Sequence, residues 1–154
     1  MSVTITIKGT PIEFPSSGES PNWAPAVLDF AQAVEEAIAS SIGPYDIPNR
    51  TFTLTNNSYT NEPITDLSFP TSSVRAASIK YSVTRITSTV TKVESGNIIV
   101  VYDGTDWELA RDYVGDANCI FDITSSGQIR ITTTALTGTY TTGKVSFSAQ
   151  ALIQ

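Results

Sequence analysis

The chain has 154 residues with a net charge of −6, one cysteine and no histidine, which fits one compact domain or a small domain with an appended element. The lack of histidine removes the commonest general base, the Ser-His-Asp arrangement and most zinc sites. The single cysteine excludes an intrachain disulfide and is typical of folding in a reducing cytoplasm.

The first expected element is a strand over residues 3–8, because apolar and polar residues alternate there. A Gly-Thr pair at 9–10 predicts a turn, and residues 12–14 would return as the second strand of a hairpin. Residues 15–21 are rich in proline, serine and glycine and are expected to form a loop.

The next expected element is a helix over residues 24–42. Pro25 suits its first turn, where a missing N–H is harmless, and Gly43-Pro44 would end it. Apolar residues recur at helical spacing and form one stripe. The stripe consists of Val27, Phe30, Ala31, Val34, Ala37, Ile38 and Ile42. One helix cannot cover its own stripe, so it must pack on the strands or on another subunit.

Residues 45–69 are expected to be irregular, apart from a strand over 51–55, because prolines interrupt them. From Val74 onward the pattern is β throughout, and turn signals recur about every ten residues. The first of these strands is marked by Ile79, Tyr81, Val83 and Ile86. The sequence therefore predicts a mainly β protein, with an antiparallel β-sandwich over about 74–154, an N-terminal strand or hairpin and one α-helix.

Residues that could carry chemistry are few. Five acids suggest a calcium site or a pair of catalytic carboxylates, namely Asp103, Asp106, Glu108, Asp112 and Asp116. They lack the spacing of an EF-hand, and acids on one face of a strand are usually solvated. Cys119 is expected to be a small core residue, and Trp23 and Trp107 packing anchors, with sugar stacking as the alternative. We expect a non-catalytic protein without cofactor or metal.

Several segments in the second half of the chain follow one another in a recognisable order. They are Ile79–Arg85, Ser95–Gly104, Asp112–Gly115, Cys119–Ile123, Gly127–Thr132, Leu136–Thr139 and Lys144–Phe147. This order, over Ala77 to Ile153, resembles a domain of tailed-bacteriophage fibre and head-decoration proteins. The resemblance implies a structural protein of the virion, made in the bacterial host cytoplasm, and it carries over no catalytic residue. The lack of a long fibre stem before the domain favours a short decorating or anchoring subunit.

Charge divides the chain into two parts. Residues 1–69 hold eight acids and two bases, whereas residues 70–154 hold seven of each. We therefore expect an acidic anchoring region over 1–69, with the strand and helix, and a β-sandwich domain over 70–154. Neither part offers a basic face for nucleic acid. The apolar runs are far shorter than the roughly 20 residues of a membrane helix.

The leading hypothesis is a capsid decoration, cement or head-fibre-base subunit that forms a homo-oligomer such as a trimer. Its partners would be the phage major capsid protein or neighbouring virion proteins. The alternative is a tail or collar component with a receptor-binding role toward carbohydrate. The candidate interface and anchoring residues are Ile5, Ile7, Trp23, Phe30, Val34 and Ile38. The last three are expected to be buried on the β domain or between subunits.

Overall fold

The computed structural model divides the chain into two compact units, Met1–Pro44 and Tyr45–Gln154. It describes residues 3–7, 10–14, 23–39 and 43–153. The boundary falls earlier than the one we drew from charge, so residues 45–69 belong with the second unit rather than with the acidic N-terminal region.

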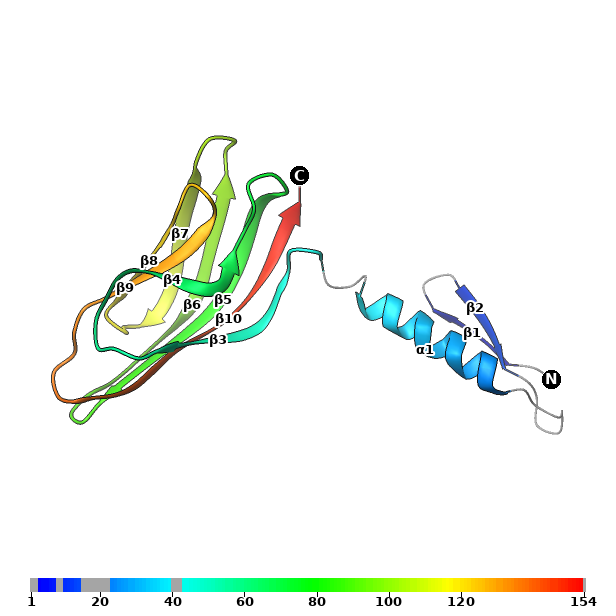
Figure 1. Cartoon of the computed structure of the whole chain (residues 1–154), viewed down its shortest axis with the longest axis horizontal. Coiled ribbons are helices and arrows are strands. Elements are labelled where there is room, and N and C mark those ends of the chain that lie inside the picture. The colour runs from blue at the N-terminus through cyan, green and yellow to red at the C-terminus, as the bar shows by residue number, and fades with distance from the viewer. Residues whose placement is uncertain (1–2, 8–9, 15–22, 40–42, 154) are drawn as a thin grey trace. The chain divides into compact units, whose positions relative to one another are not determined.

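The N-terminal unit is a hairpin with one helix. Strands β1 (Val3–Ile7) and β2 (Thr10–Phe14) pair in antiparallel register, with Ile5 opposite Ile12. Helix α1 (Trp23–Ala39) contacts both strands, and Figure 1 shows it lying alongside the hairpin. The predicted hairpin and helix are confirmed, while residues 40–42 of the predicted helix lie outside the described residues.

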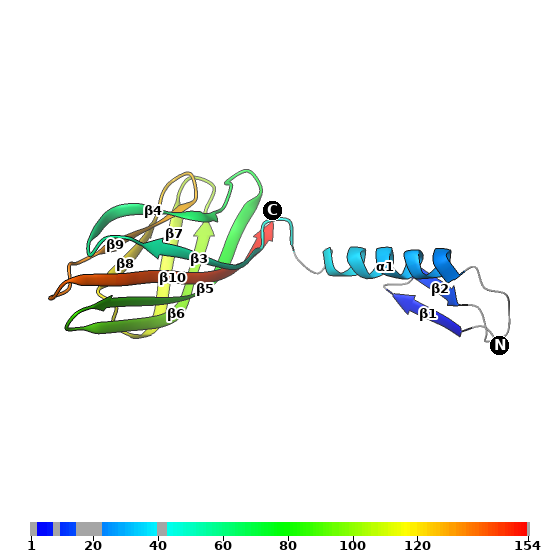
Figure 2. The same ribbon diagram turned by 60° about the horizontal axis from the view of Figure 1, so that its bottom comes forward.

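The second unit contains two antiparallel sheets. The five-stranded sheet has the order β3 (Ile47–Leu54), β10 (Tyr140–Ile153), β5 (Val74–Thr87), β6 (Thr91–Tyr102) and β7 (Trp107–Gly115). The three-stranded sheet has the order β4 (Tyr59–Ser68), β9 (Gln128–Thr133) and β8 (Cys119–Ile123). In Figure 2, β10, β5 and β6 run side by side. Strand β10 is thus an inner strand of the larger sheet, between β3 and β5.

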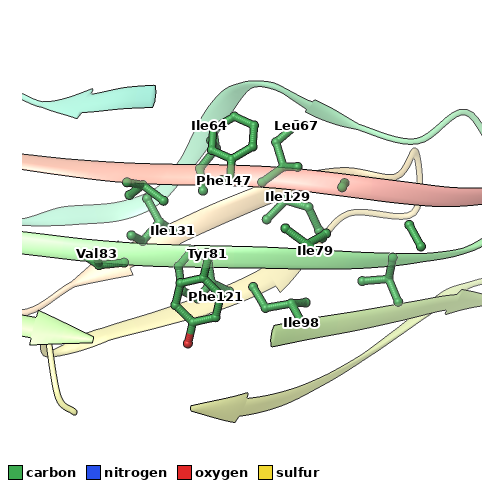
Figure 3. Packing of buried hydrophobic residues seen from close by; sticks show 14 of the residues in the cluster. Ile64, Leu67, Ile79, Tyr81, Val83, Ile98, Phe121, Ile129, Ile131 and Phe147 are labelled. Carbon is green, nitrogen blue, oxygen red and sulfur yellow. The ribbon is translucent and has the colours of Figure 1, made fainter. Parts of the chain in front are cut away.

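The core lies between the two sheets. Strand β5 buries every second side chain from Ala77 to Thr87, as expected for a strand with one face on a core. Figure 3 shows side chains of both sheets pointing toward one another, including Ile79, Ile98 and Phe147 from one sheet and Ile129 from the other. The predicted fold class, a mainly β antiparallel sandwich with N-terminal strands and one helix, is confirmed.

Residues 45–69 are more regular than we expected: the predicted strand over 51–55 is confirmed as part of the longer β3, but β4 was not predicted. Both strands lie at sheet edges, where a proline costs no ladder hydrogen bond if its missing N–H faces away from the sheet. Pro48 lies in β3 and Pro63 in β4. Edge position therefore explains how two prolines occur within strands.

The alternation of β4 is also broken by irregular pairing. Its register with β9 shifts on either side of Glu62 and Pro63, and Asn61 and Asp66 have positive φ angles of 52° and 64°. Asn and Asp tolerate this conformation better than other side chains, and such bulges bend a strand. Asn61 and Asp66 thus allow the backbone of β4 to bend, and these bends interrupt the apolar–polar alternation by which a strand is recognised in a sequence.

None of the helical segments in the described part of the chain has the length and hydrophobicity of a membrane-spanning helix.

Candidate functional site

The most concentrated group of charges inside the sandwich surrounds Glu94 on β6, whose side chain is 1% exposed. One carboxylate oxygen accepts hydrogen bonds from the Tyr81 hydroxyl at 2.7 Å and from Arg111 Nη1 at 3.0 Å. The other accepts the backbone N–H of Ala117 at 3.1 Å. Arg111 also donates to the carbonyl oxygen of Cys119 at 3.1 Å, so the cluster ties the five-stranded sheet to β8.

The Glu94 cluster is built for structure rather than for nucleophilic chemistry. Burial and the neighbouring Glu94 carboxylate raise the pKa of the Cys119 thiol from 9.0 to about 12, and burial also raises the pKa of Tyr81. Burial alone would lower the pKa of Arg111, but Glu94 and its neighbours raise it overall. At neutral pH the thiol and the phenol therefore keep their protons, and Arg111 keeps its charge.

Cys119 is expected to resist thiol reagents in the folded protein. A folded-state pKa of about 12 leaves almost no thiolate at pH 8, and the side chain is buried. Labelling with a chromogenic disulfide at pH 8 should be complete in denaturant and negligible without it. Because the folded thiol holds its proton more tightly than the unfolded one, the free energy of unfolding should fall as pH rises from about 9 toward 12. Rapid labelling of the native protein would contradict this.

A second buried cation, Arg85 on β5, holds together the loops at one end of the sandwich. It is 0% exposed. Its Nη1 donates to the carbonyl of Ala117 at 2.7 Å, and its Nη2 donates to the carbonyls of Thr134, at 2.8 Å, and Asn57. Burial lowers the pKa of Arg85. Its donors reach three separate connections, which follow β3, β7 and β9.

The acids that suggested calcium or catalysis do not converge. Asp103 accepts the backbone N–H groups of Thr105 and Asp106 at 2.7 and 2.9 Å and so shapes the turn between β6 and β7. Asp116 pairs with Lys92 at 3.0 Å. Among the described residues there is no group of three or more acids, cysteines or histidines that could hold a metal ion.

Trp107 packs in the core and is not available for sugar stacking. It is 8% exposed, and its ring lies 5.2 Å from that of Tyr102 and 6.4 Å from that of Phe69. The expectation of a packing anchor is confirmed for Trp107. The side chain of Trp23 lies outside the described part of the structure.

The predicted interface residues all lie in the N-terminal unit. Strand β1 holds Ile5 and Ile7, and α1 holds Trp23, Phe30, Val34 and Ile38. Phe30 is 37% exposed and Val34 is half-buried; the side chains of the other four lie outside the described part. Val27 and Leu28, which are 52% and 61% exposed, extend the apolar side of the helix into solvent. Burial of Phe30 between subunits stays a prediction.

The outer face of the five-stranded sheet also exposes apolar residues. Ile99 and Val101 on β6 are 53% and 47% exposed, and Val114 on β7 is 83% exposed. Beside Ile99, a surface hollow of about 220 Å³ is lined by Asn97, Ile99, Ala110, Arg111 and Asp112.

Sequence reasoning missed the buried charges, although one signal for them was present. Arg85 continues the odd-numbered core positions of β5 after Val83, and Glu94 continues the even-numbered core positions of β6 before Ile98. A charged residue on the core side of an alternating strand therefore marks a buried polar group.

The fold defines the class of the molecule: a β-sandwich preceded by a small ββα unit. No family model matches the chain, and no curated protein matches it. A solved structure with some similarity is the tailspike protein of Acinetobacter phage vB_ApiP_P1, with a TM-score of 0.41 and 14% sequence identity over 68% of this chain. The chain spans 22% of the length of that tailspike.

Proposed function

We propose that the chain is a non-catalytic structural subunit of a bacteriophage particle, in which the N-terminal unit attaches the protein and the sandwich is displayed. The phage assignment is supported by the resemblance of residues 77–153 to fibre and head-decoration domains. The non-catalytic role is supported by the interior charges, because Glu94, Arg111 and Arg85 are occupied in holding the sandwich together.

The observation that carries the attachment is the exposed apolar side of α1. Val27 and Leu28 are more than half exposed in a helix that, among the described residues of its unit, is accompanied by one short hairpin. Covering apolar surface stabilises a complex by about 25 cal/mol for each Å² removed from water. A partner on the particle would therefore gain most of its binding free energy from this side of the helix, and the acids of the N-terminal unit would orient the approach.

Attachment is tested with particles that lack the protein. They would be mixed with the purified chain and sedimented, and Leu28→Asp should weaken binding by about tenfold or more, because it places a charge in the apolar contact. The matched control is Ile120→Asp, because Ile120 is 66% exposed on β8. This variant should bind like the unmodified chain. Full-strength binding by Leu28→Asp, or loss of binding only in Ile120→Asp, would make the sandwich the anchor.

The position on the particle is a separate part of the proposal. Capsid decoration predicts hundreds of copies per particle, whereas a tail or collar component predicts about a dozen or fewer, since symmetry sets the number of sites. Quantitative gel analysis of purified particles measures this number. A carbohydrate-binding role, the second candidate for a tail component, would be tested on a glycan array with Trp23→Ala, because Trp107 is buried.

A further inference from the structure

The middle of the larger sheet is apolar on both sides. Ile98 and Val100 on β6 are fully buried in the core, whereas Ile99 and Val101 point to the opposite face and are about half exposed. An antiparallel sheet with one face in water normally carries polar residues on that face. Two adjacent β-branched apolar residues on the outer face of an inner strand therefore suggest that this face is covered.

The neighbours of these two residues are mostly small. Ile99 lies opposite Ser78 of β5 on one side and Ala110 of β7 on the other. Val101 lies opposite Ala76 of β5, with Glu108 of β7 on its far side. The side chains of Ile99 and Val101 therefore project above their smaller neighbours on the outer face. The small neighbours leave room for apolar side chains of another surface to pack beside them.

Charges of opposite sign lie on either side of β6. Asn97 of β6 is opposite Lys80 on β5 and Asp112 on β7, so the three form one row across the sheet. All three are exposed. Among the described residues, neither Lys80 nor Asp112 belongs to an ion pair. The row therefore reads positive, neutral, negative from one side of β6 to the other.

We propose that this face binds the same face of a second copy of the chain, with the two-fold axis running along β6. Such a rotation exchanges the β5 side with the β7 side and keeps each row at the same height. Lys80 then faces Asp112 of the partner subunit, and the reciprocal pair forms as well, while Ile99 and Val101 pack on the same residues of the second copy. A two-fold interface requires this kind of self-complementarity.

The dimensions of the face suit a small, reversible dimer interface. With the axis along β6, strands β5, β6 and β7 of one copy lie over β7, β6 and β5 of the other, while β10 and β3 extend beyond the contact. Three strands spaced about 4.8 Å apart, over the nine residues of β7 at about 3.4 Å each, present roughly 450 Å² on each copy, at the low end of specific interfaces. Two packed sheets lie about 10 Å apart, a distance that a lysine and an aspartate can bridge together. An axis along β5 would instead bring Lys80 against its own copy, which disfavours that arrangement.

The test is the mass of the full chain in solution, measured by sedimentation equilibrium over a range of concentrations. The unmodified chain should be a dimer, and Ile99→Glu should raise the dimer Kd by about 100-fold, because it buries two carboxylates. Ile120→Glu, which adds the same charge on the other sheet, should leave the Kd unchanged. Lys80→Glu should raise the Kd by about tenfold or more, whereas Lys144→Glu, an equal change on β10 outside the predicted contact, should not.

Charge reversal of both residues gives the sharpest result. Asp112→Lys alone should weaken the dimer as Lys80→Glu does, and the double variant Lys80→Glu/Asp112→Lys should regain most of the affinity, because each reversed residue again meets an opposite charge. A monomeric or trimeric chain, a dimer that survives Ile99→Glu, or a double variant weaker than both singles would overturn the proposal. None of these outcomes depends on attachment through α1, so this inference stands or falls separately from the proposed function.

Discussion

Deleting residues 144–154 is expected to leave an insoluble protein. Strand β10 lies between β3 and β5 and pairs with both along most of its length. Its loss would break the larger sheet into two pieces and remove the core side chains of Val145, Phe147 and Ala149. Truncating one buried phenylalanine costs about 3–5 kcal/mol, and a whole domain is stable by only about 5–15 kcal/mol.

The soluble fraction after cell lysis and the far-ultraviolet circular dichroism of any soluble product measure this effect. The matched control is deletion of residues 152–154 alone, where Leu152 and Ile153 are 67% and 58% exposed. That shorter deletion should leave a soluble chain with a cooperative unfolding transition. A soluble chain ending at Gly143 with an unchanged unfolding curve would show that β10 does not hold the sheet together.

Replacing Arg85 with methionine is expected to lower the free energy of unfolding by at least about 3 kcal/mol. Methionine fills similar space but donates no hydrogen bond, so the carbonyls of Asn57, Ala117 and Thr134 would lose a buried charged donor. Each hydrogen bond to a charged group contributes about 1.5–3 kcal/mol to stability. Each buried carbonyl left without a donor costs about 1–3 kcal/mol. The melting temperature should fall by about 10 °C or more.

Arg85→Lys separates the role of charge from that of shape. Lysine keeps the charge but lacks the planar fork that reaches two directions at once, so this variant should recover only part of the loss. Arg50→Met is the control, because Arg50 is an exposed arginine on the edge strand β3. Equal stability of Arg85→Met and the unmodified chain in urea denaturation would mean that water replaces the guanidinium at no cost.

The strands after Val74 and the single helix were predictable because local patterns determine them. Alternation such as that of Ile79, Tyr81 and Val83 is visible in any window of a few residues. The alternation of apolar residues ends before Ile86, which we assigned to the same strand: the core position there is Arg85, and Ile86 lies half-buried on the other face. Hydrophobicity alone cannot identify a buried arginine, because its acceptors come from residues 57, 117 and 134.

The boundary between the units was missed for a different reason. We drew the boundary from the distribution of charged residues, which reports composition and not strand pairing. The sandwich begins with β3 and β4, whose acids and prolines are typical of loops and whose bulges interrupt the alternation of a strand. Strand β3 gains its hydrogen bonds from β10, at the other end of the sequence. A pairing that joins such distant segments leaves no local signal, so only the three-dimensional arrangement places residues 47–68 in the sandwich.

The inner position of β10 also has a kinetic consequence during synthesis. Until the ribosome has released residues 140–153, the facing edges of β3 and β5 have no strand to pair with, and the smaller sheet has no complete surface to cover its core side. Folds dominated by such distant pairings have high contact order and fold slowly. Until folding is complete, unpaired strand edges can pair with other chains and cause aggregation. The nascent protein should therefore be most prone to aggregation just before β10 emerges, and chaperone binding in that interval should raise its yield.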